Sequence, residues 1–236
     1  MLYFIGDIHA ELELLAYKLK EKKIKDSHLV QVGDFGFGFL GDREKAAIES
    51  LNKALKAGNN LLYVIRGNHD DPSYFEEGRE VGNIRIVPDY SVLELSGYSI
   101  LLAGGAISVD RASRVLGKSY WKEEEFIFNI DKLESALNTV KKLDIVVTHN
   151  APSEFWPFEL NNLVRAYARR DKNLFLELSH ERAQHSKLLK WVKSRFSPLH
   201  WYYGHFHVSQ KNRYDDLMYF ALGELEIREQ FQDFAR

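Results

Sequence analysis

Short runs of apolar residues, many of them β-branched or aromatic, recur through the first third of the chain. The runs are residues 2–5, 29–32 and 61–65. Each is too short for a buried helix and is flanked by polar residues or glycine. Each run therefore predicts a buried β-strand.

Between these runs, apolar residues recur at intervals of three and four positions among charged ones. Leu12, Leu15 and Leu19 share one face of the first such stretch, and the second stretch, residues 42–57, begins acidic and ends before Gly58. These periods and end signals are typical of amphipathic helices. The resulting β-α-β-α-β order predicts a parallel sheet with right-handed crossovers.

Strand-like segments continue through the rest of the chain. They are residues 84–87, 91–95, 98–103, 144–148, 199–203 and 214–222. The turn pairs Pro88-Asp89 and Ser96-Gly97 predict that the first three of these form a hairpin, and a turn around Asn212 is expected before the last strand.

Two longer stretches of the second half predict helices. Residues 131–142 carry Asp131 and Glu134 at the spacing of a capping box. Residues 157–195 are charged, mostly helical in pattern, and longer than a simple crossover. We expect an amphipathic helix packed on the sheet there, with a lid or a substrate-selecting insertion as the alternative. No repeat or Gly/Ser linker divides the chain, which predicts a single α/β domain over residues 1–236.

Composition narrows the class of protein. The 236 residues are 45% hydrophobic, and 32 Lys and Arg against 34 Asp and Glu give a net charge of −2. The apolar content excludes a disordered chain, and the charge balance provides no global basic excess for nucleic acid or anionic lipid. The absence of cysteine excludes disulfides, thiolate metal sites and cysteine nucleophiles. Since neither a signal peptide nor a membrane-spanning run is recognisable, we expect a cytoplasmic protein without membrane contact.

Polar residues suited to metal binding follow five of the predicted strands. The five loops read Gly6-Asp7-Ile8-His9, Gly33-Asp34, Gly67-Asn68-His69-Asp70, Thr148-His149-Asn150 and Gly204-His205-Phe206-His207. Any one of them alone is better explained as a helix cap or a surface polar group. Because ligands bind at the carboxyl ends of strands in open α/β sheets, five such loops together predict one shared site.

The donor types in these loops restrict the metal chemistry. Imidazole, carboxylate and amide groups without sulfur favour Mn, Fe, Zn or a similar cation. Two cations that share a carboxylate can activate a water molecule and neutralise the oxygens of a phosphoryl group. The loops therefore favour a two-metal hydrolytic site.

The order of these motifs resembles that of the calcineurin-like metallophosphoesterase superfamily, in particular its small bacterial and phage members. The motifs Asp-x-His, Gly-Asp, Gly-Asn-His-Asp, His and Gly-His-x-His occur in that order over residues 6–207. The resemblance implies a four-layer α-β-β-α sandwich of two mixed sheets flanked by helices. It also implies a dinuclear centre, with Mn preferred and Fe, Zn, Ni or Mg as alternatives, that hydrolyses a phosphate ester.

The resemblance also implies a role for each motif residue. The implied metal ligands are Asp7, His9 and His207 for one ion, Asn68, His149 and His205 for the other, and Asp34 as the bridge between them. His69 would contact the phosphoryl oxygen or protonate the leaving group, and Asp70 would orient it.

Several positions depart from the protein serine/threonine phosphatase branch of this superfamily. Ala10 replaces the glycine of the first motif, and no Asp-Arg pair follows Asp34 in register. These departures disfavour a protein phosphatase and leave the phosphate without its usual arginine. The candidate is Arg111, in the loop after residues 98–103, because a guanidinium suits phosphate geometry. A surface salt bridge between Arg111 and Asp110 is the alternative, and Arg66 is a weaker candidate for the phosphate.

A rival function rests on Gly36, Gly38 and Gly41, which match G-x-G-x-x-G between a predicted strand and a predicted helix. This pattern is typical of a dinucleotide-cofactor-binding protein, but it leaves the histidine loops unexplained. We therefore expect a hydrolase of a small phosphomonoester or nucleotide. A phosphodiesterase or nuclease of the same superfamily, which would act on nucleic acid, is the alternative.

Overall fold

The computed structural model describes residues 1–157 and 162–230. The helices are α1 (Leu12–Glu21), α2 (Glu44–Ala57), α3 (Ile130–Leu137), α4 (Asn162–Ala168) and α5 (Leu174–Arg195). The strands of the first half are β1 (Leu2–Ile5), β2 (His28–Gln31), β3 (Leu61–Val64), β4 (Arg79–Val81), β5 (Ile84–Ile86), β6 (Ser91–Leu95) and β7 (Tyr98–Ala103). Those of the second half are β8 (Ile145–Thr148), β9 (His200–Tyr203), β10 (Gln210–Tyr214), β11 (Leu217–Ala221) and β12 (Ile227–Glu229).

The strands of the described residues form two mixed six-stranded sheets. The first has the order β12-β1-β2-β3-β5-β4, in which β1, β2, β3 and β5 are parallel and the two outer strands are antiparallel. The second has the order β10-β11-β9-β8-β7-β6, with β11, β9, β8 and β7 parallel. Each sheet thus has a parallel centre whose strand ends meet at one edge.

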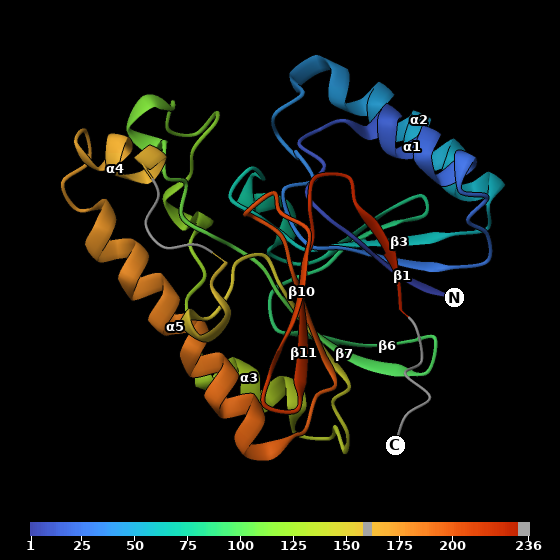
Figure 1. Ribbon diagram of the computed structural model, residues 1–236. Coiled ribbons are helices and arrows are strands. Elements are labelled where there is room, and N and C mark those ends of the chain that lie inside the picture. The colour runs from blue at the N-terminus through green and yellow to red at the C-terminus, as the bar shows by residue number, and fades with distance from the viewer. Residues whose placement is uncertain (158–161, 231–236) are drawn as a thin grey trace.

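Helices cover the outer face of each sheet. Figure 1 shows α1 and α2 side by side on one flank of the molecule, and α3 with the long α5 on the other. Leu15 of α1 is fully buried against the first sheet, and Leu188 of α5 is fully buried against the second. Between the sheets, Phe4 and Tyr202 stack with ring centroids 3.7 Å apart. The predicted four-layer α-β-β-α architecture is confirmed.

The predicted hairpin is correct for two of its three segments. β6 and β7 pair antiparallel around the Ser96-Gly97 turn, as expected. β5, however, pairs with β3 in the other sheet. The prediction failed because the Pro88-Asp89 turn carries the chain from one sheet to the other, which a local pattern does not reveal.

Two further local predictions were wrong. Asn129, not Asp131, caps α3, since the Asn129 side chain accepts a hydrogen bond from the Lys132 N–H at 2.9 Å. The turn expected around Asn212 lies instead at Asp215, because Asn212 pairs with Tyr219 inside the β10–β11 ladder. β10 is a polar, exposed edge strand, and it lacks the alternation that marks a half-buried one.

Among the described residues, no helix combines the length and the apolar content that a span requires.

Candidate metal centre

The five polar loops meet at one edge of the two sheets. The first three follow β1, β2 and β3, which are parallel neighbours in the first sheet. The other two follow β8 and β9, which are parallel neighbours in the second. Since both sets of strand ends face the same region, the loops bring carboxylate, amide and imidazole groups together across the sheet interface.

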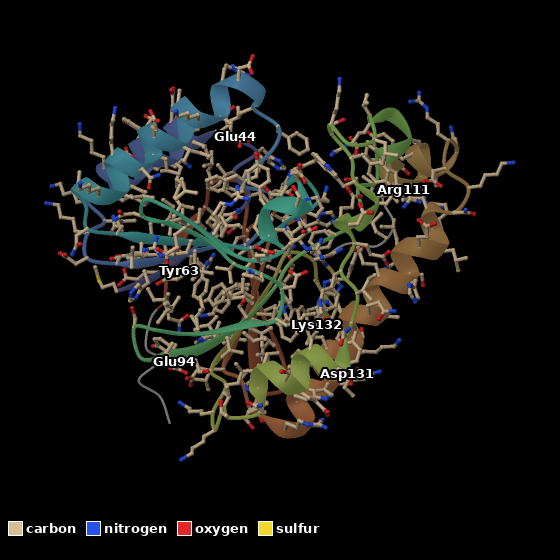
Figure 2. All side chains as sticks on the ribbon, turned by 180° about the vertical axis from the view of Figure 1, so that it is seen from behind. Glu44, Tyr63, Glu94, Arg111, Asp131 and Lys132 are labelled. Carbon is tan, nitrogen blue, oxygen red and sulfur yellow. The ribbon has the colours of Figure 1, made fainter. Side chains whose placement is uncertain are left out.

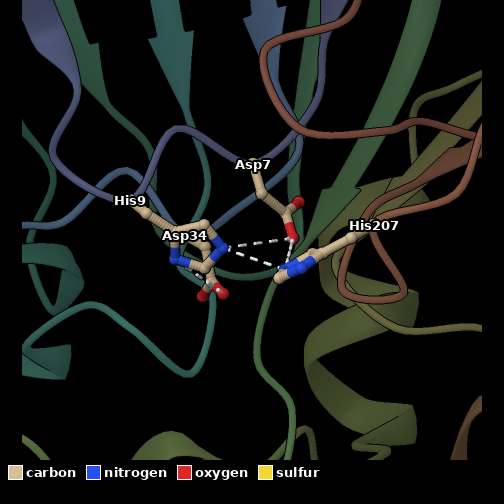
Figure 3. Close-up of side chains that lie close together, drawn as sticks. All are labelled: Asp7, His9, Asp34 and His207. Carbon is tan, nitrogen blue, oxygen red and sulfur yellow. Dashed lines mark hydrogen bonds and ion pairs between the residues drawn. The ribbon is translucent and has the colours of Figure 1, made fainter.

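The first group of side chains gathers around Asp7 (Figure 3). One oxygen of Asp7 lies 3.2 Å from His207 Nε2, and His207 Nε2 lies 2.9 Å from His9 Nε2. The ligand atoms of Asp7, His9, Asp34 and His207 all lie within 4.8 Å of one another. These four residues form a compact donor set from three loops.

The second group gathers around the Asn68 amide oxygen. His149 Nε2 lies 3.1 Å from Asn68 Oδ1, and His205 Nδ1 lies 2.9 Å from the same oxygen. Asp34 Oδ1 is 3.2 Å from His149 Nε2. The other Asp34 oxygen faces the first group, 3.8 Å from His9 Nδ1. A single carboxylate thus contacts both groups.

The backbone around these residues is unusual for L-amino acids. Four of the residues are in the left-handed region: His9 at φ 48°, Asp34 at 59°, His205 at 68° and His207 at 52°. Non-glycine residues rarely adopt this conformation, which costs about 1–3 kcal/mol each and clusters at functional sites. Packing that favours this arrangement must therefore offset the strain at several donors together.

Glycine permits the close approach of the loops at two positions. A Cβ at Gly67 would overlap the Asp34 carboxylate, and a Cβ at Gly204 would overlap that of Asp7. Both glycines come directly before a motif residue, so the loops can pack onto the buried carboxylates only with glycine at these places.

The charges of the site depend on Asp34. Burial alone would raise the pKa of the Asp34 carboxyl, but the charges and hydrogen bonds of His149 and His69 hold that pKa well below its usual value. Burial also acts to lower the pKa of His149, yet the Asp34 charge raises it to about 9. Burial and the neighbouring His149 hold the pKa of His205 well below its usual value. Without metal, the site therefore holds an ionised Asp34, a protonated His149 and a neutral His205, so His149 must release its proton before that nitrogen can bind a metal.

The donor chemistry fits divalent cations. His9 Nδ1 lies 3.0 Å from His69 Nδ1, and His9 Nε2 lies 2.9 Å from His207 Nε2. At most one proton fits between the two nitrogens of each pair, so other nitrogen lone pairs remain for a cation. Nitrogen and oxygen donors of this kind suit Mn, Fe, Zn and similar ions. All seven predicted ligands lie in the two groups, so each group offers donors that suit a divalent cation.

His69 lies between the two groups and the solvent. Its backbone N–H donates to Asp34 Oδ1 at 2.7 Å, and its Nδ1 lies 2.9 Å from Asp34 Oδ2. The opposite ring nitrogen, Nε2, contacts the Arg114 guanidinium. His69 therefore presents one nitrogen to the shared carboxylate and the other away from it.

The resemblance implied that Asp70 orients the His69 ring, but in the structure Asp70 forms hydrogen bonds with the backbone of the loop after Asp34. Its buried carboxylate accepts hydrogen bonds from the backbone N–H groups of Phe35, Gly36, Phe37 and Gly67. Burial and the Asp34 charge raise the pKa of Asp70 to about 7, while these backbone donors act in the opposite direction. Asp70 thus holds the loops after β2 and β3 in register.

The glycine pattern is not a dinucleotide site, which corrects the rival prediction. The Gly36 and Phe37 N–H groups donate to Asp70, and the Gly38 N–H donates to Glu44 Oε2 at 2.6 Å. The backbone donors that would hold a pyrophosphate are therefore already bound to carboxylates. A Cβ at Gly36 would also overlap Ala10, so this glycine serves loop packing.

Arg111, predicted to bind phosphate and labelled in Figure 2, forms ion pairs with two carboxylates instead. Its Nε donates to Asp171 at 2.7 Å, and a second nitrogen contacts Glu177. Arg114 lies beside His69 and lines the cavity next to the donor groups, where Arg111 does not appear. The structure therefore brings Arg114, not Arg111, to the site.

Three residues that the sequence analysis did not identify form hydrogen bonds or ion pairs with the donors or with each other. Asn68 Nδ2 donates to Ser108 Oγ at 3.1 Å, and Ser108 Oγ donates to the buried Glu124 at 2.9 Å. Glu224 lies 2.9 Å from His207 Nδ1. Ser108 and Glu224 each follow a strand, β7 and β11, whose carboxyl end lies at the same edge, and this position is the signal that could have identified them.

Comparisons with known proteins agree with this geometry. A family model described as calcineurin-like phosphoesterase matches residues 1–209. No curated protein matches the chain.

Among solved structures, a protein proposed to be a 5′-nucleotidase from Staphylococcus aureus aligns with a TM-score of 0.54 at 11% identity, over 96% of this chain and 49% of that one. A phosphopantetheinyl hydrolase from Mycobacterium tuberculosis aligns with a TM-score of 0.48 at 15% identity, over 94% of this chain and 89% of that one. A predicted phosphoesterase from Streptococcus pneumoniae aligns with a TM-score of 0.38 at 13% identity, over 94% of this chain and 71% of that one.

At these identities, the 5′-nucleotidase alignment shows a shared fold, and this chain spans about half the length of that protein. The family model carries more weight, because it covers most of the chain and ends just beyond the last histidine loop. The chain belongs to the calcineurin-like phosphoesterase family.

Proposed function

We propose that this protein is a phosphoesterase that uses two divalent cations to hydrolyse a small phosphate ester, with monoesters preferred over diesters. The observation that carries the proposal is the position of Asp34, whose two oxygens face two separate groups of donors. A shared carboxylate is what a two-metal hydrolytic site requires.

The two groups supply the ligands for both ions. Asp7, His9 and His207 would hold the first, Asn68, His149 and His205 would hold the second, and Asp34 would serve both. Mn is the metal that the family resemblance favours, with Fe, Zn, Ni and Mg as alternatives, and the imidazole, carboxylate and amide donors suit ions of this kind.

The chain's own residues then position the substrate and move protons. Cations bound here would supply a deprotonated water at neutral pH and neutralise the phosphoryl oxygens. His69 Nδ1 lies 2.9 Å from Asp34 Oδ2, which leaves Nε2 on the side of Arg114 and the cavity. Arg114 would pair with the phosphoryl group of a bound ester, which would free Nε2 to hold a proton and pass it to the departing oxygen.

A hydrolysis screen tests this function directly. Protein stripped with EDTA and reloaded with Mn²⁺ should hydrolyse the monoester p-nitrophenyl phosphate faster than the diester bis-p-nitrophenyl phosphate. Mononucleotides should likewise be hydrolysed faster than cyclic nucleotides. Activity on all of these esters should disappear in EDTA. Faster turnover of the diesters would favour the phosphodiesterase alternative. Inactivity on every ester with each of the metals named would contradict the proposal.

Ser108 should control metal affinity without binding metal. Its hydroxyl donates to Glu124 and so leaves a lone pair for the Asn68 N–H, which keeps the Asn68 oxygen turned toward His149. Ser108→Ala frees the amide to rotate, and we expect a loss of about 10- to 100-fold in metal affinity, the usual effect of removing such support. Titration with Mn²⁺ followed by calorimetry measures it.

The matched control is Ser113→Ala, because Ser113 is exposed in the same loop. Melting temperatures in EDTA should separate folding from metal binding. Equal Mn²⁺ affinities for the two variants would show that Ser108 does not position Asn68.

A further inference from the structure

A cavity of about 320 Å³ opens beside the metal donors and has two chemically different parts. One part is polar and includes Asp34, Asn68, His69, His205, His207 and Arg114. The other is apolar and includes Val109, Trp156, Val164, Tyr167, Leu178 and Phe206. The second part is far more apolar than a site for phosphate alone requires.

The aliphatic side of the apolar part belongs to a small hydrophobic cluster of its own. Ile107, Leu174 and Leu178 are its buried members, and Val164 and Tyr167 pack against them. This cluster joins the loop after β7 to α4 and α5. The cavity wall therefore rests on a packed base and not on isolated surface side chains.

The opposite side is aromatic and is held in place. The Phe206 and Trp156 rings meet edge to face with centroids 4.7 Å apart, and the Arg182 guanidinium lies 4.6 Å from the Trp156 ring centroid. Arg182 in turn donates to the Leu178 carbonyl at 3.3 Å. Edge contact and a stacked cation both restrict an aromatic ring, so the indole has a defined orientation beside the donors.

Ion pairs join the aliphatic wall to the rest of the protein. Arg111 pairs with Asp171, in the turn between α4 and α5, and with Glu177 on α5. Arg111 has a raised pKa, since both carboxylates favour its charged form although burial opposes it. The segment 157–195, for which a lid or a selecting insertion was the alternative expectation, thus contributes a fixed wall through α4 and α5, while its residues 158–161 lie outside the described residues.

We propose, on the basis of the phosphoesterase function above, that this cavity selects phosphomonoesters whose alcohol part carries a flat, apolar aromatic group. The phosphoryl group lies at the polar end beside His69 and Arg114, and the ring lies between the aromatic wall at Trp156 and the aliphatic wall at Leu178. Burying such a ring removes apolar surface of ligand and wall from water at once.

The size and charge of the cavity argue for a small ligand. Its volume is near the lower end of the range for small-molecule sites, which suits one or two rings. A sugar phosphate or a phosphorylated peptide would leave hydroxyl or amide groups against Val109, Val164 and Leu178 without hydrogen-bond partners. Such unpaired polar groups weaken binding, so the lining disfavours these ligands.

Non-hydrolysable phosphonates test the selection without depending on turnover. Benzylphosphonate and methylphosphonate carry the same charged group and differ in the ring. Calorimetry on Mn²⁺-loaded protein should show benzylphosphonate binding at least about tenfold more tightly, as expected for burial of one aromatic side chain. Equal affinities would overturn the inference whatever the variants do.

Variants locate the preference in the cavity. Trp156→Ala should abolish most of the difference between the two phosphonates, and Trp156→Phe should retain much of it. Leu176→Ala is the control, because Leu176 is 74% exposed on α5 and does not line the cavity. A preference that survives Trp156→Ala in a folded protein would show that this wall does not select the ligand.

Hydrolysis of benzyl phosphate and methyl phosphate, which both release alkoxides, separates this inference from the proposed function. Faster turnover of the benzyl ester, with a difference lost in Trp156→Ala, supports both. If neither these two esters nor the esters of the hydrolysis screen are hydrolysed with any of the metals named, the proposed function fails, and the phosphonate affinities still decide whether the cavity selects an aromatic group.

Discussion

Replacing Asp34 with Asn should remove both cations and reduce phosphomonoester hydrolysis by about 10³-fold or more. The two oxygens of Asp34 face His149 on one side and His9 on the other, at 3.2 and 3.8 Å. Asparagine keeps the shape and the oxygen that accepts the His69 N–H, but it removes the negative charge that both groups share. Elemental analysis after Mn²⁺ loading and gel filtration, together with the rate on p-nitrophenyl phosphate, measures the two effects.

Two other carboxylates make this test specific. Asp7→Asn should lose only the first ion, since Asp7 contacts His207 and the His205 N–H but none of the imidazoles of the second group that the structure describes. Asp131→Asn, on the exposed face of α3 (Figure 2), should keep both ions and full activity. Retention of two ions by Asp34→Asn at wild-type affinity would show that Asp34 is not the bridge.

The convergence of the five loops could be predicted because it follows from strand direction. Buried apolar runs identify β1, β2, β3, β8 and β9, and parallel strands place the residues that follow them at a common edge. Asp34 and His149 are remote in sequence and come from different sheets, yet their side chains lie 3.2 Å apart. Neither the exact helix ends nor the partner of every strand had to be known for this result.

Details of the irregular loops could not be predicted, since no period constrains them. The choice of Arg111 over Arg114 depended on which side chain the loop after β7 turns toward the cavity. A short turn, in which the Arg114 N–H bonds to the Arg111 carbonyl at 3.0 Å, sends the two guanidinium groups to different partners. The Arg111 partners, Asp171 and Glu177, are on the far segment. Such a choice is made by tertiary contacts.

The role of Asp70 was similarly hidden. It follows His69 directly, which suggested a local partner, but its backbone donors include Phe35, Gly36 and Phe37 on another loop. A carboxylate that organises a remote backbone gives no local pattern. The left-handed conformation of Asp34 in that same loop is equally invisible, because isolated residues of this kind avoid it.

His69→Asn should separate metal binding from catalysis. The His69 backbone N–H, which the substitution keeps, is the group that holds Asp34 Oδ1, so the shared carboxylate should stay in place. The variant loses the ring nitrogen that faces Arg114 and the cavity. We therefore expect wild-type metal content and a kcat that falls by about 10²–10⁴, the usual contribution of a general acid. His180→Asn, whose side chain is 64% exposed on α5, is the matched control and should change neither.

The leaving group distinguishes proton donation from other roles of His69. p-Nitrophenolate departs with little assistance, whereas an alkoxide needs a proton, so the loss in His69→Asn should be much larger for benzyl phosphate than for p-nitrophenyl phosphate. An equal loss on both substrates would mean that His69 stabilises the phosphoryl group by its charge together with Arg114. Loss of bound metal would instead make His69 a ligand, as its 2.9 Å contact with the shared Asp34 would then indicate. Either result would replace the general-acid role, and the Arg114→Lys variant would separate the two, since it keeps the charge beside His69 but not the planar guanidinium.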